Sequence, residues 1–345
     1  MDILDNQNVI AQRDTQDALG LAAETTSQLV HDFEFSAPDH ADIHAVVFAG
    51  MGGSALQAEF VKTWPELNIP YVISKDYELP AFINEHTLVI VSSYSGNTEE
   101  TLSALDIALQ HNAQIVVTTG GGKLQEAAEH HNLPHIIVPK AVQPRMAVFY
   151  AFRALLEALV AYGLAEESSL DTLQVASSNL QQHVVQWTKD VETENNPAKQ
   201  LALKLMGKTP IIYSGPKMAP AAYKWKISFN ESAKNTSWYG TFPEFNHNEF
   251  IGWSSHPVEK PFAVIDLHSN YEHPRTKLRF EVTDRLLSGM RPKAIPITAE
   301  GESVIEQMLY LTLLGDFVSI YLGLLNGVDP SPVALVEKFK KELDA

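Results

Sequence analysis

Two short segments of the sequence combine glycine with hydroxyl side chains in a spacing that suits an anion. The residues are Gly52, Gly53 and Ser54 in the first segment and Ser93, Ser95 and Thr98 in the second. Each segment follows an apolar run and precedes a helical pattern. The first backbone N–H groups of a helix have no partner within it, and the helix dipole is positive there. Each segment is therefore a candidate phosphate-binding turn.

Helix capping is the alternative explanation for these hydroxyls. A single cap uses one hydroxyl, whereas the stretch from Ser92 to Thr98 carries four serine or threonine residues. Glu99 and Glu100 then begin the helical pattern, as acidic residues often do in a first turn. We therefore favour phosphate binding over capping alone.

The elements around both turns are typical of a parallel sheet. Apolar runs of strand length occur at 45–49, 71–74, 88–93, 114–119 and 135–138. Helical patterns separate them, and a long apolar helix is expected at 146–160. This alternation predicts βαβ units with helices on both faces of the sheet. Ligands of such sheets bind at the carboxyl ends of the strands, where both turns fall.

The second half of the chain repeats this plan. Helical spacing without strands continues through 166–199. Strands are then expected at 210–214, 262–267 and 294–297, with helices at 219–234, 277–290 and 304–325. A further helix is expected near the N-terminus, at 14–30. We predict an α/β protein of two domains: residues 1–160, and residues 161–345 with the helical bridge, the second sheet and a C-terminal helix.

Composition excludes several classes of partner. The 345 residues carry a formal net charge of −17, which disfavours nucleic acid and anionic membranes. The absence of cysteine excludes disulfides, thiolate metal sites and cysteine nucleophiles, and it fits a cytoplasmic location. The acidic N-terminus has no apolar signal core. The apolar stretch at 308–325 contains Asp316, which indicates a buried helix rather than a membrane span.

The first glycine turn has a rival interpretation. Gly50, Gly52 and Ala55 satisfy the dinucleotide fingerprint, and Asp76 lies roughly twenty residues further on. An oxidoreductase of this kind would leave the turn at 93–98 without a role. Two phosphate-type turns on neighbouring strand ends fit a single sugar phosphate better.

Five motifs together resemble one known family. They are Gly-Met-Gly-Gly-Ser at 50–54, Ser-Tyr-Ser-Gly-Asn-Thr-Glu-Glu-Thr at 93–101, Gln-Pro-Arg at 143–145, Asn-Glu-Ser-Ala-Lys at 230–234 and Glu-Phe-Asn-His-Asn-Glu at 244–249. In this order they resemble the bifunctional phosphoglucose/phosphomannose isomerases, which have two sugar isomerase (SIS) domains. The resemblance implies flavodoxin-like, three-layer αβα domains. It also implies interconversion of fructose 6-phosphate with glucose 6-phosphate and mannose 6-phosphate, without a cofactor or a metal.

The resemblance assigns roles to single residues. Those that contact the substrate are the phosphate-binding hydroxyls Ser54, Ser93, Ser95 and Thr98 and the backbone of Gly52 and Gly53, which passes close to the sugar. Arg145 corresponds to the cation that stabilises the enediolate, and Glu231 to the base that moves a proton between C1 and C2. His247 corresponds to the residue that opens the sugar ring, contributed by the partner subunit of a homodimer. Lys340 matches a catalytic lysine, with Lys341 as the neighbouring alternative.

The proposed chemistry needs these residue types on physical grounds. Histidine titrates near neutrality and suits ring opening, and a buried carboxylate suits the shared base. A fixed cation stabilises charge that develops on the enediolate oxygens. The alternatives are a surface role for Glu231 and Arg145, a structural role for His247, and Glu244 or Glu249 as the base.

Other functional classes fit the sequence less well. A SIS-containing transcriptional regulator needs a basic recognition helix, and no such helix is evident. Glutamine-dependent glucosamine-phosphate synthases need a cysteine nucleophile. A sugar-phosphate-binding protein without catalysis stays open, although it would not need Glu231, His247 and Arg145 together. A lone cluster of histidines, at 130, 131 and 135, lies around a helix end and fits the helix dipole better than a metal.

Overall fold

The computed structural model describes residues 3–38, 42–140, 143–255 and 261–343. The chain forms two compact units, which we call the first unit, Glu24–Asn179, and the second unit, Met1–Ala23 with Leu180–Ala345. The division thus falls within α7 (Ser168–Val184), later than the predicted boundary at residue 160. The N-terminal segment joins the second unit because Asp5 accepts hydrogen bonds from the Thr193 backbone at 2.9 Å and from Lys199 at 3.1 Å.

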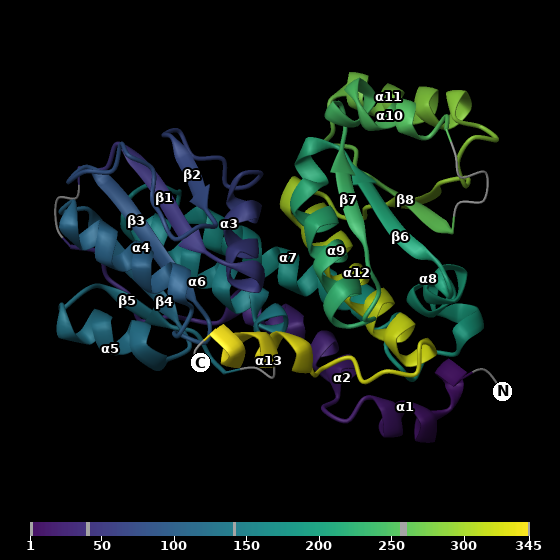
Figure 1. The fold of residues 1–345 in the computed structure, drawn as a ribbon, viewed down its shortest axis with the longest axis horizontal. Helices are drawn as coiled ribbons and strands as arrows, with labels where there is room; N and C mark the ends of the chain where they lie inside the picture. The colour runs from purple at the N-terminus through teal and green to yellow at the C-terminus, as the bar shows by residue number, and fades with distance from the viewer. Residues whose placement is uncertain (1–2, 39–41, 141–142, 256–260, 344–345) are drawn as a thin grey trace. The chain divides into compact units, whose positions relative to one another are not determined.

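The first unit contains a five-stranded parallel sheet (Figure 1). Its strands are β1 (Ala45–Gly50), β2 (Tyr71–Ser74), β3 (Thr87–Ser93), β4 (Gln114–Thr119) and β5 (His135–Ile137). The strand order is β2-β1-β3-β4-β5, and every pair is parallel. This is the order of the flavodoxin-like doubly wound sheet, so the predicted fold class is confirmed.

Helices cover both faces of this sheet. They are α3 (Leu56–Val61), α4 (Glu99–Gln110), α5 (Gly122–His130), α6 (Val148–Ala161) and the 3₁₀ helices η2 (Thr25–Val30), η3 (Gly52–Ala55) and η4 (Pro144–Met146). Alternate strand residues such as Val89 and Val91 pack with Leu105 of α4 and Leu124 of α5. On the other face, α3 packs against α6 through aromatic side chains.

The second unit contains a four-stranded parallel sheet. Its strands are β6 (Thr209–Ser214), β7 (Trp238–Thr241), β8 (Phe262–His268) and β9 (Ile295–Thr298), in the order β7-β6-β8-β9. Strand β6 therefore corresponds to β1 of the first sheet, and β8 to β3. The sequence prediction missed β7, because its four residues form an edge strand with an exposed first half.

The second unit also contains several helices. They are α1 (Gln7–Arg13), α2 (Ala18–Glu24), α8 (Pro197–Leu205), α9 (Ala219–Glu231), α10 (Glu249–Gly252), α11 (Pro274–Leu286), α12 (Val304–Leu325), α13 (Ala334–Leu343) and the 3₁₀ helices η1 (Ile3–Asp5), η5 (Thr193–Asn195), η6 (Pro216–Met218) and η7 (Glu244–His247). Helix α12 is the one described helix that is long and apolar enough to cross a membrane. It packs against α8 and α9, and 89% of its most apolar window is buried, as predicted for a core helix.

The predicted helix at 14–30 is shorter and broken. Asp14 accepts hydrogen bonds from the backbone N–H groups of Ala18 at 2.7 Å and Leu19 at 3.0 Å, so the helix begins only at Ala18. Asp17 before it has a left-handed φ of 50°. After Glu24 the helix tightens into the 3₁₀ turn η2. A side-chain cap therefore decides where this helix starts.

Candidate functional site

The turn after β3 forms a compact group of hydroxyls at the carboxyl edge of the first sheet. The Ser93 and Thr98 hydroxyl oxygens lie 2.8 Å apart. The Gly96 backbone N–H donates to Ser93 Oγ at 3.1 Å, and the Asn97 N–H donates to Ser95 Oγ at 3.3 Å. Ser93 is almost fully buried, whereas Ser95 is exposed. The turn therefore holds its hydroxyls in one place while one side stays open to a ligand.

The start of α4 is available to an anion. Thr98 is the N-cap residue, yet its side chain makes no capping hydrogen bond to the helix. Its hydroxyl bonds to Ser93 instead, which disfavours the interpretation that the hydroxyls only cap the helix. Glu99 at the first helical position accepts a hydrogen bond from the Tyr77 hydroxyl at 3.0 Å. The positive helix end and the neutral donors at this turn suit a phosphate group.

Gly96 allows this turn to close against the next one. Its φ is +69°, and a Cβ built on it would lie 1.6 Å from the carbonyl oxygen of Gly121. Thr119, at the end of β4, donates its hydroxyl to the Ser93 carbonyl at 2.8 Å or to the Gly121 carbonyl at 2.8 Å. Only glycine combines this backbone conformation with this close approach.

The turn after β1 lies beside the turn after β3. The Tyr94 backbone N–H donates to Ser54 Oγ at 3.1 Å, which joins the two turns directly. A Cβ on Gly53 would lie 3.3 Å from the backbone nitrogen of Arg145, so the Gln-Pro-Arg segment passes close to the same place. Arg145 itself is only 3% exposed, so the alternative of a surface arginine is wrong.

Two supporting residues escaped the sequence analysis. Gln57 of α3 is fully buried and donates to the Ser92 hydroxyl at 2.7 Å, so it braces the end of β3. Thr119 braces the same turn from β4. The available signal was a polar residue inside or directly after an apolar run, because buried polar groups need hydrogen-bond partners.

Glu231 and His247 lie at opposite ends of the strands of the second sheet: Glu231 near their starts and His247 near their carboxyl ends. Glu231 is the last residue of α9, and just beyond it Asn235 donates to the Lys208 carbonyl at 2.8 Å, at the start of β6. His247 ends η7, which follows β7; the Phe242 N–H there donates to the carbonyl of Ser214 at 2.9 Å, at the end of β6. The thirteen residues of α9 span roughly 20 Å. The second unit therefore does not bring these two side chains together.

The remaining predicted site residues are more exposed. His247 is exposed, and Glu231 is half-buried at the end of α9, whose Phe229 and Trp225 are fully buried. Lys340 lies on α13, a helix without buried residues, and pairs with Glu337 at 3.1 Å. Glu244 and Glu249, the alternative candidates for the base, already accept hydrogen bonds from neighbouring side chains.

Those rival bases, Glu244 and Glu249, accept hydrogen bonds from residues of their own region. Glu244 accepts from Asn248 Nδ2 at 2.6 Å. Glu249 accepts from the hydroxyl of Tyr213, which also accepts from the Trp253 indole at 3.1 Å. Burial raises the pKa of Tyr213 far above its usual value, so Tyr213 stays a proton donor to Glu249. These contacts favour a structural role for Glu249.

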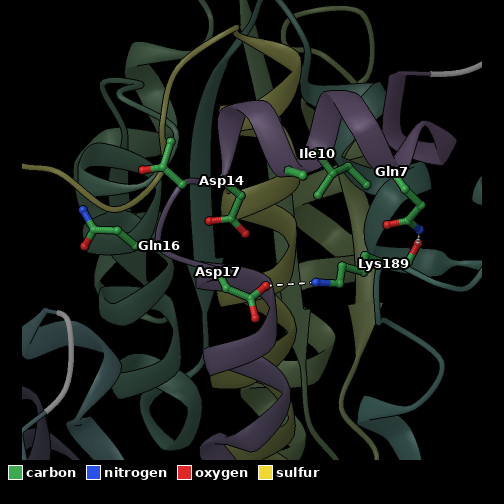
Figure 2. Close-up of a pocket in the computed structure, with 8 residues that line it drawn as sticks. Gln7, Ile10, Asp14, Gln16, Asp17 and Lys189 are labelled. Atoms are coloured by element: carbon green, nitrogen blue, oxygen red, sulfur yellow. Dashed lines mark hydrogen bonds and ion pairs between the residues drawn. The ribbon is translucent and has the colours of Figure 1, made fainter.

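A cavity of about 250 Å³ in the second unit has the wrong chemistry for a phosphate (Figure 2). Asp14, Asp17 and Lys189 line it, and Lys189 pairs with Asp17 at 3.0 Å. Burial raises the pKa of the Asp14 carboxyl. None of the predicted site residues is among the described residues that line this cavity. The phosphate turns of the first unit therefore remain the candidate site.

Comparison with protein-family models supports both units. Residues 41–165 match the SIS domain, and residues 194–343 match the bacterial phospho-glucose isomerase C-terminal SIS domain. Among solved structures, a glucose-6-phosphate isomerase like protein from Thermus thermophilus superposes with a TM-score of 0.67 and 21% identity, covering 99% of each chain. At this identity the likeness shows the fold alone.

Two curated relatives carry the same name. A bifunctional phosphoglucose/phosphomannose isomerase of Caldicellulosiruptor bescii is 38% identical over 309 residues, which are 88% of this chain and 90% of that protein. The protein of that name from Aquifex aeolicus is 34% identical over 315 residues, covering 90% and 94%. Identity at this level over nearly both full lengths, with a SIS domain matched in each unit, makes this chain a member of the bifunctional phosphoglucose/phosphomannose isomerase family.

Proposed function

We propose that the chain is an aldose–ketose isomerase that interconverts fructose 6-phosphate with glucose 6-phosphate and mannose 6-phosphate. The observation that carries this proposal is the pair of turns after β1 and β3, joined by the bond from Tyr94 to Ser54. Ser54, Ser93, Ser95 and Thr98 supply neutral donors beside an uncapped helix start. A dianion needs such local donors, because the net charge of −17 repels it at long range. The dinucleotide alternative gives the second turn no role.

The reaction divides between a cation, a base and an acid. Arg145 is buried beside the phosphate turns, so its charge is held in place where negative charge develops on the enediolate oxygens. Glu231 takes the proton from one carbon of the open sugar and returns it to the neighbouring carbon. His247 moves the proton that opens the ring, and Lys340 assists at the substrate hydroxyls. The reaction needs no redox cofactor, because the oxidation of one carbon is balanced by the reduction of its neighbour in the same sugar.

A homodimer accounts for the positions of Glu231 and His247. One second unit holds them at opposite ends of its strands, and the α9 helix that connects these two ends is roughly 20 Å long. A base and a ring-opening group must both reach one hexose, so we propose that His247 of the partner subunit completes the site. We also propose a cytoplasmic location, since the chain has no cysteine and its substrates are metabolic phosphosugars.

The assignment of the base is tested by kinetics. Fructose 6-phosphate is supplied, and glucose 6-phosphate is measured with a coupled dehydrogenase; mannose 6-phosphate is supplied in a parallel assay. Glu231→Gln should lose about 10²-fold or more in kcat with little change in KM. Glu281→Gln, an exposed carboxylate on α11, is the matched control and should keep full activity. Full turnover by Glu231→Gln contradicts the assignment, and binding without turnover by the wild type favours a non-catalytic phosphosugar-binding protein.

The shared site is tested by mixing inactive variants. Glu231→Gln and His247→Ala homodimers are dissociated, mixed and reassociated. If each site takes its base from one chain and its histidine from the other, mixed dimers regain one intact site. Activity should then rise towards one quarter of the wild type, because about half of the dimers are mixed and each has one of two sites. Mixtures that stay inactive although subunits exchange contradict the shared site.

A further inference from the structure

Asp42, His44 and His86 gather at the amino-terminal edge of the first sheet, opposite to the phosphate turns. His44 directly precedes β1, and His86 directly precedes β3. These strands pair in parallel with Ala45 opposite Thr87, and the His44 N–H donates to the His86 carbonyl at 2.8 Å. The backbone hydrogen bonds between β1 and β3 therefore fix the positions of the His44 and His86 backbones relative to each other.

Each of the two imidazoles places one ring nitrogen next to the Asp42 carboxylate. His44 Nε2 lies 3.1 Å from Asp42 Oδ1, and His86 Nδ1 lies 3.2 Å from Asp42 Oδ2. The two imidazole rings stack with centroids 4.6 Å apart and an angle of 11° between their planes. One ligand atom from each residue lies within 4.8 Å of the others. Neighbouring ligands of a tetrahedral zinc ion with bonds of about 2.0–2.1 Å are separated by roughly 3.3 Å.

We propose that Asp42, His44 and His86 bind a divalent first-row transition metal, with Zn²⁺ as the reference ion. Two imidazoles and one carboxylate are ligands for zinc, cobalt or nickel, whereas magnesium and calcium require mainly oxygen. Asp42 and His44 are exposed and His86 is half-buried, so an ion reaches the group from solvent and keeps water in its remaining positions.

A surface ion pair is the competing explanation for the same contacts. An ion pair between Asp42 and an imidazole requires a protonated ring, while metal binding requires the free lone pair of the nitrogen. The two explanations therefore predict opposite responses to pH. Protonation strengthens the ion pair and releases the metal.

This metal does not reach the substrate. The six residues of β1 and the seven of β3 separate the cluster from the phosphate turns, a distance of roughly 20 Å. Its effect is on stability: an ion bound only by the folded first unit links the segment before β1 to the segment before β3. The inference is independent of the isomerase proposal, because its readout is metal binding.

The test uses the full chain without a histidine tag, freed of metal with a chelator. Zn²⁺ binding is measured by isothermal titration calorimetry, and Co²⁺ binding by its visible absorption. Wild-type protein should bind one Zn²⁺ per chain at about pH 7.5 and much more weakly at about pH 5.5. His44→Ala and His86→Ala should each weaken Zn²⁺ binding about tenfold or more. Zn²⁺ should also raise the melting temperature of the wild type more than that of either variant.

The matched control is the double variant His130→Ala/His131→Ala. These exposed histidines also lie next to each other in the first unit, with ring centroids 4.9 Å apart. His130 and His131 do not belong to the group of Asp42, His44 and His86. Their loss should therefore leave the Zn²⁺ affinity unchanged. Equal affinity in wild type, His44→Ala and His86→Ala overturns the proposal, as does an affinity that increases on acidification. Metal-free unfolding midpoints that agree among all variants exclude misfolding as the cause of weakened binding.

Discussion

Gly96→Ala is the sharpest test of the proposed phosphate turn. The substitution places a methyl group 1.6 Å from the Gly121 carbonyl oxygen, where ordinary contact begins at 3.4 Å. Either the turn after β3 or the turn after β4 must move, and the obstacle is backbone rather than a flexible side chain. The φ of +69° adds left-handed strain of about 1 kcal/mol for alanine. Overpacking of this kind adds about 2 kcal/mol or more, for a total loss of about 3 kcal/mol.

Gly163 offers a matched control in the same unit. Its φ is +68°, nearly that of Gly96, but a Cβ built on it meets nothing within 4 Å. Gly163→Ala therefore carries the left-handed strain without the clash and should lose only about 1 kcal/mol. The difference between the two variants isolates the close approach of the two turns.

Both variants are compared by urea unfolding and by steady-state kinetics. Gly96→Ala should raise KM for fructose 6-phosphate about tenfold or more, because displacement of the turn moves Ser93, Ser95 and Thr98 together. Inorganic phosphate should compete less well against it. Gly163→Ala should keep the wild-type KM. The reasoning is refuted if the free energies of unfolding of the two variants agree within about 0.5 kcal/mol and Gly96→Ala keeps its KM.

Three further predictions follow from single contacts. Ser93→Ala removes the acceptor for Gly96 and the partner of Thr98, so it should lower stability by about 1–2 kcal/mol in urea unfolding and raise KM more than it lowers kcat. Arg145→Lys keeps a charge but loses the planar guanidinium, so kcat should fall about tenfold or more at nearly constant KM in the coupled assay. Burial raises the pKa of Asp266 to about 7, so the unfolded chain gives up this proton at lower pH than the folded chain does. The free energy of unfolding should therefore fall between about pH 4 and about pH 7, by at most about 4 kcal/mol from this group, and pH-dependent unfolding of Asp266→Asn should lack that decline.

Strand prediction succeeded where burial on both faces dictated the residue types. The strand at 114–119 is buried from its second residue onward and agrees with the structure residue for residue. The half-buried edge strand at 71–74 also agrees, because it keeps an apolar run. Strand β7 failed because an edge strand needs neither an apolar run nor length. The helix expected at 14–30 failed because the pattern of apolar residues does not report the Asp14 cap or the tightening after Glu24. Apolar periodicity thus finds buried elements better than it finds their ends.

The sequence predicts the grouping of candidate site residues best where these residues are close in the chain. The hydroxyls of the turn at 93–98 are set by one loop, so their grouping was readable from the chain. The burial of Arg145 depends on contacts of η4 with η3, more than ninety positions earlier, and composition alone suggested a surface arginine. The Asp42, His44 and His86 cluster depends on β1 lying next to β3. Strand order is the information that one sequence does not provide.

The described turns of the second unit that correspond to the proposed phosphate turns differ from them in their hydrogen bonds. In the second unit the turn after β6 is occupied from within, because Glu272 accepts a hydrogen bond from the Met218 N–H at 3.1 Å. Glu272 is 4% exposed, and a Cβ on Gly215 would lie 2.2 Å from its carboxyl carbon. An internal carboxylate thus takes the place that an anion takes at a helix start.

The second corresponding turn, after β8, is also satisfied internally. Ser269 donates its hydroxyl to Gln307 of α12 at 2.6 Å and accepts from the Tyr271 N–H at 3.1 Å. The Ser269 hydroxyl is therefore used by the protein itself, whereas Ser95 in the turn after β3 is exposed. The carboxyl end of the second sheet is therefore closed to a phosphate by the protein's own side chains.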